Sequence, residues 1–120
     1  MGKRVVLGLT EKVTIIGHNG KEVKVTARID TGATASSIDS KLAGKLELGP
    51  ILKSKVVKSA YGSRTRPIVK AKVKLNSDII EAEFSLVDRS HLTYSVLLGQ
   101  NILRQGDFLI DPNKKMEGDS

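Results

Sequence analysis

The chain has 120 residues, enough for one hydrophobic core and too few for two. It contains no cysteine, which excludes disulfides and thiolate metal sites, and no apolar run approaches the roughly 18 residues that span a bilayer. Lysine and arginine outnumber aspartate and glutamate by 20 to 13, which gives a net charge of +7. Residues 5–9 are too short for a secretory signal, so we expect a cytoplasmic protein.

The first predicted elements are short strands separated by a glycine turn. Residues 4–10 and 11–16 predict a strand or a strand pair. The following His18-Asn19-Gly20 indicates a hairpin, because Asn-Gly suits the positive-φ positions of a type I′ turn. Residues 23–29 alternate apolar and polar side chains and predict the return strand.

That strand ends at Asp30-Thr31-Gly32-Ala33, which is the first candidate functional site. A carboxylate at the end of a buried strand is costly unless hydrogen-bond donors support it. Gly32 allows the backbone to aim N–H groups at the Asp30 carboxylate, and Thr31 adds a hydroxyl that can anchor the turn. Strand alternation places Arg28 on the same face as Asp30. Taken alone, Asp-x-Gly is also a common surface turn.

The middle of the chain predicts a strand, a turn of helix and then a basic hairpin. A short strand is expected at residues 37–38 and one helical turn over 39–44, capped by Asp39 or Ser40. Gly49-Pro50 breaks the chain. Residues 53–60 are strand-like, and Tyr61-Gly62-Ser63-Arg64 forms a polar tip.

Positive charge is concentrated in this region. No acidic residue occurs between Glu47 and Asp78, whereas eight basic residues do, namely Lys53, Lys55, Lys58, Arg64, Arg66, Lys70, Lys72 and Lys74. Such a block can bind nucleic acid or an acidic peptide. The alternative is a solvated strand face.

Residues 66–75 and 79–87 predict the clearest hairpin. A two-residue Ser77-Asp78 loop would place Val73 opposite Ala82. The same register sets Lys74 opposite Glu81 and Lys72 opposite Glu83, and such cross-strand pairs contribute about 0.2–1 kcal/mol each. Both faces of the hairpin are satisfied by this register.

The C-terminal part predicts a buried strand at 96–98, a short helix over 99–105 and a last strand at 108–110. Many short strands, glycine punctuation and little helix favour an all-β, barrel-like domain. We place a single domain at residues 1–112 and a polar, disordered tail at 113–120.

Two of these motifs together resemble a known family. Asp30-Thr31-Gly32-Ala33, followed by Leu97-Leu98-Gly99-Gln100-Asn101-Ile102-Leu103, resembles the retropepsin-like aspartic proteases, the single-motif relatives of pepsin. Residues 27–37 and 84–90 through 108–112 look like a prokaryotic branch, often labelled ATP-dependent zinc proteases and associated with a ligase that adds glutamates to a ribosomal protein. The resemblance covers roughly residues 10–112 and implies an all-β closed barrel with one short helix near the C-terminus, as a homodimer.

The resemblance also implies residue roles. Asp30 would be the catalytic carboxylate, supported by Thr31, Gly32 and Ala33, and Gly99 the structural glycine of the downstream motif. The tip Tyr61-Gly62-Ser63-Arg64 would be a substrate-binding flap, with an ordinary hairpin turn as the alternative. Retroviral members carry an acid and an arginine where this chain has Thr34 and Gln100, so the dimer contacts differ. One chain has one such motif, and a two-fold homodimer would supply the second carboxylate.

The implied function is an aspartic endopeptidase without a metal or cofactor. The chain has only His18 and His91 as histidines, no His-Glu-x-x-His motif and no glycine-rich phosphate loop. Arg28 on the cleft floor, with Lys58, Arg64 and Arg66 around the flap tip, favours acidic or glutamate-rich peptides. Alternatively, Arg28 pairs with a structural acid such as Asp88 and the flap charges are solvated.

A second function comes from a different class: a non-catalytic dimeric β-module that binds acidic peptide or nucleic acid through the basic flap. Nucleic acid is the weaker expectation, because Tyr61 is the only aromatic residue in the basic stretch and stacking on bases needs more. No membrane partner is expected.

Overall fold

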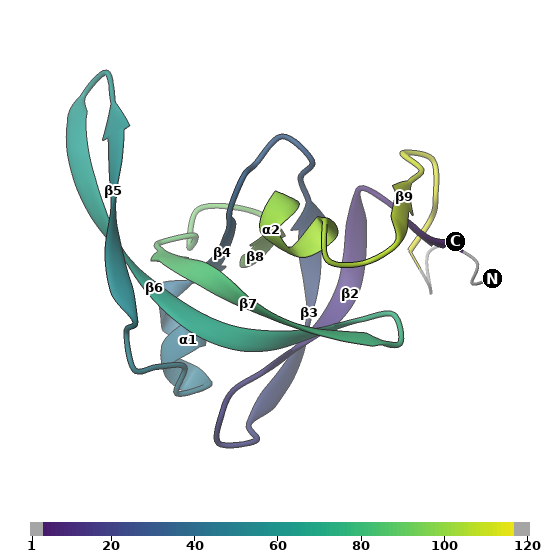
Figure 1. Ribbon diagram of the computed structural model, residues 1–120, viewed down its shortest axis with the longest axis horizontal. Coiled ribbons are helices and arrows are strands. Elements are labelled where there is room, and N and C mark those ends of the chain that lie inside the picture. Colours follow the sequence, from purple (N-terminus) through teal and green to yellow (C-terminus); the bar gives the residue numbers. More distant parts are fainter. Residues whose placement is uncertain (1–3, 117–120) are drawn as a thin grey trace.

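A computed structural model describes residues 4–116 of the chain, except the side chain of Ser59. The described residues form nine strands and two short helices (Figure 1). These are β1 (Val5–Leu7), β2 (Thr10–Ile16), β3 (Glu22–Ile29), β4 (Ser36–Asp39), α1 (Ser40–Lys45), β5 (Lys53–Ser59), β6 (Gly62–Leu75), β7 (Asp78–Val87), β8 (Val96–Leu98), α2 (Gln100–Leu103) and β9 (Phe108–Ile110). Helix α1 is the helical turn expected after residue 39, and Asp39 is its N-cap.

Six strands close into a barrel in the order β2-β3-β8-β4-β7-β6, because β6 also pairs with β2. Strand β5 pairs with β6 alone, and the β5–β6 hairpin extends away from the barrel (Figure 1). Strands β1 and β9 form a separate parallel pair. The all-β closed barrel, with α2 as the short helix near the C-terminus, is confirmed.

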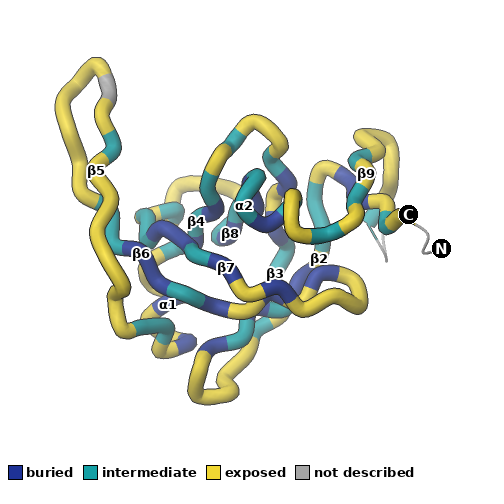
Figure 2. The backbone as a smooth tube through the Cα atoms, in the orientation of Figure 1, coloured by how far each residue is buried: buried dark blue, intermediate teal, exposed yellow. Residues whose placement is uncertain are grey.

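The barrel interior is filled almost entirely by aliphatic side chains. The buried residues lie along the barrel strands, whereas the β5–β6 hairpin is mostly exposed (Figure 2). Fully buried residues include Ile15 of β2, Val69 and Val73 of β6, and Leu98 of β8. Phe84 of β7 is 0% exposed and is the one aromatic side chain among the buried residues of the described part. Alternation with period two is what a sheet with one buried face requires.

The β6–β7 hairpin differs from its predicted register. Its loop is Asn76-Ser77, since Leu75 pairs with Asp78, and Lys72 therefore faces Glu81 rather than Glu83. Asn76 adopts a φ of 58°, a left-handed conformation that asparagine tolerates better than most residues. The shift moves each partner by two residues, so the same side chains still point inward and the hydrophobic pattern fits both registers.

The β2–β3 hairpin forms as predicted, but its turn is not type I′. Only Gly20 has a positive φ in this turn, at 84°, whereas type I′ needs two such residues. Asn19 acts through its side chain instead, accepting a hydrogen bond from the Lys21 N–H at 3.0 Å and donating one to Glu47 at 2.8 Å.

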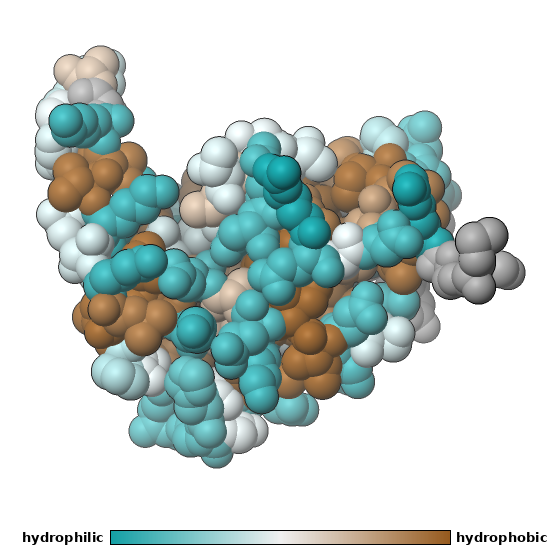
Figure 3. Space-filling view, in the orientation of Figure 1, coloured by the Kyte–Doolittle hydropathy of each residue, from teal (hydrophilic) through white to brown (hydrophobic). Residues whose placement is uncertain are grey.

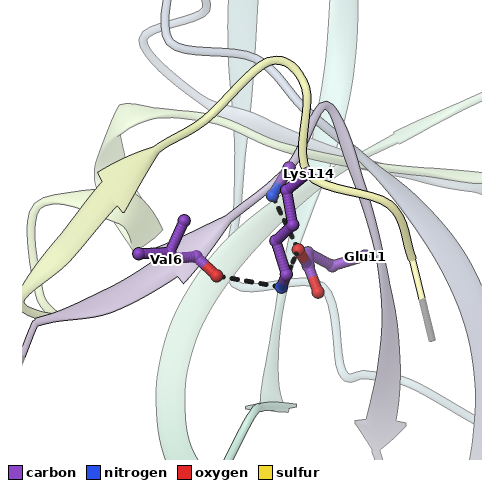
Figure 4. A network of polar contacts seen from close by, with 4 residues as sticks. Val6, Glu11 and Lys114 are labelled. Carbon is purple, nitrogen blue, oxygen red and sulfur yellow. Dashed lines mark hydrogen bonds and ion pairs between the residues drawn. The ribbon is translucent and has the colours of Figure 1, made fainter.

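The two ends of the described chain meet beside β2. The Nζ atom of Lys114 lies 2.9 Å from the carbonyl oxygen of Val6 and 2.8 Å from the Glu11 carboxylate (Figure 4). Residues 117–120 of the expected disordered tail lie outside the described residues, so this tail and the domain boundary at 112 stay predictions. No helix within residues 4–116 is long and apolar enough to cross a membrane.

Candidate active site

Asp30 lies directly after β3, at the rim of the barrel. Its N–H donates to the carbonyl oxygen of Leu98 at 2.9 Å, so the chain stays attached to β8 up to this residue. The half-buried carboxylate accepts a hydrogen bond from the Gly32 N–H at 3.0 Å, and the Ala33 N–H reaches the Asp30 carbonyl at 3.3 Å. One backbone donor, the Gly32 N–H, therefore supports the carboxylate, and the Ala33 N–H closes the turn.

Gly32 aims its N–H at the Asp30 carboxylate as expected, whereas Thr31 does not act as expected. Thr31 is exposed, and its hydroxyl makes no hydrogen bond to any described residue, so it does not anchor the turn within one chain. Gly32 does not use a left-handed backbone, and a Cβ there would lie 3.4 Å from Asp30 Oδ1, an ordinary contact.

The start of α2 holds the loop that follows Asp30. The N–H groups of Gln100 and Asn101 donate to the carbonyl oxygens of Ala33 and Thr34 at 2.8 and 3.2 Å. The Gln100 side chain donates to the Thr31 carbonyl oxygen at 2.8 Å. Gln100 thus binds the backbone of the turn, at the position where retroviral members carry a charged partner.

Gly99 leaves no space for a side chain. A Cβ on Gly99 would lie 2.2 Å from the Ala35 carbonyl oxygen and 2.7 Å from that of Ala33, far inside van der Waals contact. The close approach of α2 to the Asp30 loop therefore depends on glycine at this position.

Sequence reasoning missed a buried polar network beneath the loop. Ser36, only 1% exposed, accepts a hydrogen bond from the Gly99 N–H at 2.9 Å and donates to Asn101 Oδ1 at 2.6 Å. Asn101 in turn donates to the Glu83 carbonyl oxygen at 3.0 Å. The signal that could have revealed it is a serine at an inward-facing position of β4, where an apolar residue is expected.

A cavity of about 440 Å³ lies between this loop and the β5–β6 hairpin. It is lined by residues 32–37, Lys55, Val57, Arg66, Ser85, Arg89 and Leu97. No acidic side chain is among the lining residues, and three of them are cations. The cavity beside the loop that follows Asp30 is therefore lined by positive charge.

The hairpin presents one charged face to this cavity. Lys55 pairs with Arg66 and Val57 with Arg64, and cross-strand partners point to the same side of a sheet. Lys58 pairs with Ser63, which places it on the opposite face. The predicted contribution of Lys58 to the cleft is therefore wrong, and Lys55 takes its place.

The predicted flap residues come together at the hairpin tip, away from Asp30. Tyr61, Gly62, Ser63 and Arg64 line a separate cavity of about 370 Å³ with Val57 and Arg66. Tyr61 is fully exposed at the tip. Only Val57 and Arg66 line both cavities, so in the single chain the tip does not cover Asp30.

Arg28 lies on the barrel rim in a row with Leu97 and Ser37, its neighbours across β8 and β4. Its side chain is exposed and makes no ion pair with any described residue, so the alternative pairing with Asp88 is not found. Asp88 is held by Ser90, whose hydroxyl and N–H both donate to it and keep the pKa of the Asp88 carboxyl below its ordinary value.

Arg89 is a second cation of this rim that sequence reasoning missed. Its Nε donates to the Tyr94 carbonyl oxygen at 2.8 Å and its Nη1 to the Ser37 hydroxyl at 3.1 Å. Burial lowers the pKa of the guanidinium below its ordinary value, and the Arg28 charge acts in the same direction while Asp39 opposes them. No local sequence pattern separates Arg89 from any other loop arginine.

The two histidines lie apart in exposed loops. Within residues 4–116, no group of three histidine, aspartate or glutamate side chains is placed to hold one metal ion.

Solved structures with the same fold include viral and bacterial proteins. A Legionella pneumophila protein of unknown function, Lpg0085, is 19% identical over 96% of this chain and 98% of its own, with a TM-score of 0.68. The EIAV protease bound to the inhibitor HBY-793 is 20% identical over 88% of this chain and 89% of its own, with a TM-score of 0.61. A retropepsin-like aspartic protease from Rickettsia conorii is 20% identical over 78% of this chain and 77% of its own, with a TM-score of 0.54.

No curated protein matches the sequence of this chain. A family model described as retropepsin-like aspartic endopeptidase RimB matches residues 39–118, which is 80 of the 120 residues. The match begins after Asp30 and covers the downstream glycine motif. By this match, the chain belongs to the RimB-like family of retropepsin-like aspartic endopeptidases.

Proposed function

We propose that this protein is an aspartic endopeptidase that acts as a homodimer through two Asp30 carboxylates. The observation that carries the proposal is the Asp30 turn, held by α2 beside a cavity, in a chain of this family. None of the remaining aspartates among the described residues is followed by Thr-Gly, namely Asp39, Asp78, Asp88, Asp107 and Asp111. One chain therefore supplies one carboxylate, and a symmetric partner supplies the other.

The chemistry follows from placing two carboxylates close together. At about 4 Å they repel by roughly 4 kcal/mol at an effective dielectric near 20, which is about 3 pK units. One of the pair then stays protonated near neutral pH, as in aspartic proteases generally, and the shared proton belongs to the pair. The ionised carboxylate takes a proton from a water molecule, and the oxygen of that water attacks the scissile carbonyl carbon. The protonated carboxylate donates its proton to the carbonyl oxygen. The C–N bond then breaks as the leaving amine is protonated.

One feature of the single chain supports a partner at this place. The Thr31 hydroxyl is exposed beside Asp30 and makes no hydrogen bond of its own within the described chain, so it is available to link the two turns.

The direct test of peptidase activity is incubation of the purified protein with a proteome-derived peptide library, with cleavage products identified by mass spectrometry.

The charges around the cavity support acidic or glutamate-rich peptides as substrates. Arg89 lines the cavity from the barrel, and Lys55 and Arg66 line it from the hairpin. Arg28 is not in the lining, but it is the strand partner of Leu97, which is. Charge-assisted hydrogen bonds to a peptide carboxylate are about twice as strong as neutral ones. A glutamate or aspartate near the scissile bond would thus find donors on both sides of the cavity.

Replacing Arg28 by alanine should lower kcat/KM for acidic peptides by about 10- to 100-fold, since a hydrogen bond to a charged group contributes about 1.5–3 kcal/mol. Neutral peptides should lose much less. The measurement is kcat/KM for a peptide pair that differs only by glutamate and glutamine. An equal loss for both peptides, or a wild-type preference for neutral hydrophobic peptides, would contradict the role of Arg28.

The second candidate is a non-catalytic dimeric β-module that binds acidic peptides through the hairpin. The lining of the cavity, which includes the cations Lys55, Arg66 and Arg89 and no acidic side chain, favours it. One measurement distinguishes the two functions, namely whether bound acidic peptides are cleaved. A non-catalytic module releases them intact, whatever residue is at position 30.

A further inference from the structure

Arg89 is held on the barrel by two hydrogen bonds, and its guanidinium has further N–H donors that no described residue uses. A guanidinium has five N–H donors, and the described residues accept hydrogen bonds from only Nε and Nη1. Both acceptors, the Tyr94 carbonyl oxygen and the Ser37 hydroxyl, are neutral. No carboxylate of the described chain lies within ion-pair distance of Arg89, and the side chain borders the cavity beside the Asp30 loop.

Two more cations face the same cavity from the hairpin. Lys55 and Arg66 are direct cross-strand partners, and like charges at such positions destabilise a strand pair. Neither makes an ion pair with a described residue. The two glutamates of β7 are taken by other lysines, since Lys53 reaches Glu83 at 3.2 Å and Lys70 reaches Glu81 at 3.9 Å.

The hairpin itself has little to hold it against the barrel. It is exposed along most of its length (Figure 2), and a notch separates its outer part from the barrel (Figure 3). The charges on the two sides of the cavity have the same sign, so they oppose closure until an anion lies between them.

We propose that Arg89, Lys55 and Arg66 together bind one carboxylate, and that this carboxylate draws the hairpin onto the barrel. Arg89 is the fixed side of this subsite, and the hairpin cations are its moving side. The inference rests on the proposed function in one respect: the carboxylate belongs to a peptide bound beside Asp30. Closure is then selective, because a peptide without an acid at this position leaves the three charges repelling one another.

The test observes hairpin closure directly and needs no cleavage. The chain has no tryptophan, so Tyr61→Trp introduces a single tryptophan, which can be excited selectively, at the hairpin tip. This substitution is combined with Asp30→Asn, so that added peptide stays intact. Both peptides are amidated at the C-terminus, so that only side chains supply carboxylates. Titration with tetraglutamate should then shift the tryptophan emission to shorter wavelength, and tetraglutamine at the same concentrations should not.

The variants separate the subsite from general charge. Arg66→Gln should raise the Kd of tetraglutamate about 10- to 100-fold and abolish the shift, and Arg89→Gln should do the same. The Arg66 side chain makes no hydrogen bond or ion pair with a described residue, so its variant tests the subsite even if Arg89→Gln disturbs the loop that Arg89 braces. Lys58→Gln removes the same charge from the outer face of the hairpin and is the matched control, with a Kd expected within about twofold of the unmodified value.

Several results would overturn the inference. These are an equal shift with tetraglutamine, an equal loss in Lys58→Gln, a retained shift in Arg66→Gln, no tetraglutamate binding at all, and calorimetric binding of tetraglutamate without any shift. Each is measured in a variant that lacks the Asp30 carboxylate. Failure of closure is therefore distinguishable from failure of the wild-type protein to cleave peptides.

Discussion

Asp30→Asn is expected to abolish peptide cleavage and leave the fold intact. An asparagine side chain cannot take or give the proton that water activation requires, and loss of general acid–base catalysis alone costs about 10²- to 10⁴-fold. The amide oxygen can still accept the hydrogen bond that Gly32 now donates to Asp30. Mass spectrometry of the peptide library measures cleavage, and circular dichroism measures the fold.

Two additions identify the kind of chemistry in the same assay. Cleavage by the wild-type protein should survive EDTA and should be blocked by pepstatin-like statines, which mimic the tetrahedral intermediate. Full activity in Asp30→Asn would show that Asp30 is not catalytic. Activity that is lost in EDTA and restored by zinc would assign the reaction to a metal.

Gly99→Ala is expected to lower the free energy of unfolding by about 3 kcal/mol, at the upper end of the usual cost of overpacking. The new methyl group would collide with two backbone carbonyl oxygens, at 2.2 and 2.7 Å, and neither can rotate away as a side chain would. The collision should also move the loop that carries Asp30, so cleavage should fall with stability. Urea unfolding and peptide cleavage measure the two effects.

Gly44→Ala is the matched control for this change. Gly44 lies in α1, and a Cβ there meets no heavy atom within 4 Å. Alanine in a helix interior is favoured over glycine by about 0.5–1 kcal/mol, so this variant should be at least as stable as the wild type. If Gly99→Ala and Gly44→Ala change the free energy of unfolding equally, the loop does not depend on close packing at Gly99.

The strands could be predicted from the sequence because their information is local. Alternation fixed the inward faces of β3, β6 and β7, and glycine or asparagine marked the turns between them. The β6–β7 register was missed because a shift of two residues keeps the same face inward, and only the backbone of Asn76 distinguishes the two loops.

The candidate site was harder to predict because much of it is built from residues distant in sequence. Ser36 and Asn101 are separated by 65 positions, and Arg89 contacts Ser37 across 52. No local pattern reports such contacts. Asp30 and Gly99 were accessible only because each lies in a short motif whose spacing resembles a known family.

The central claim is that one active site needs Asp30 from each of two chains, and mixing the wild type with Asp30→Asn tests it most directly. The two proteins are unfolded together in urea and refolded, and sedimentation verifies that dimers form. In an equal mixture about one dimer in four retains both carboxylates, so activity per wild-type chain should fall to about half of that without the variant. Activity per wild-type chain that stays unchanged by the variant, or sedimentation as a monomer at concentrations where peptides are cleaved, would contradict the claim.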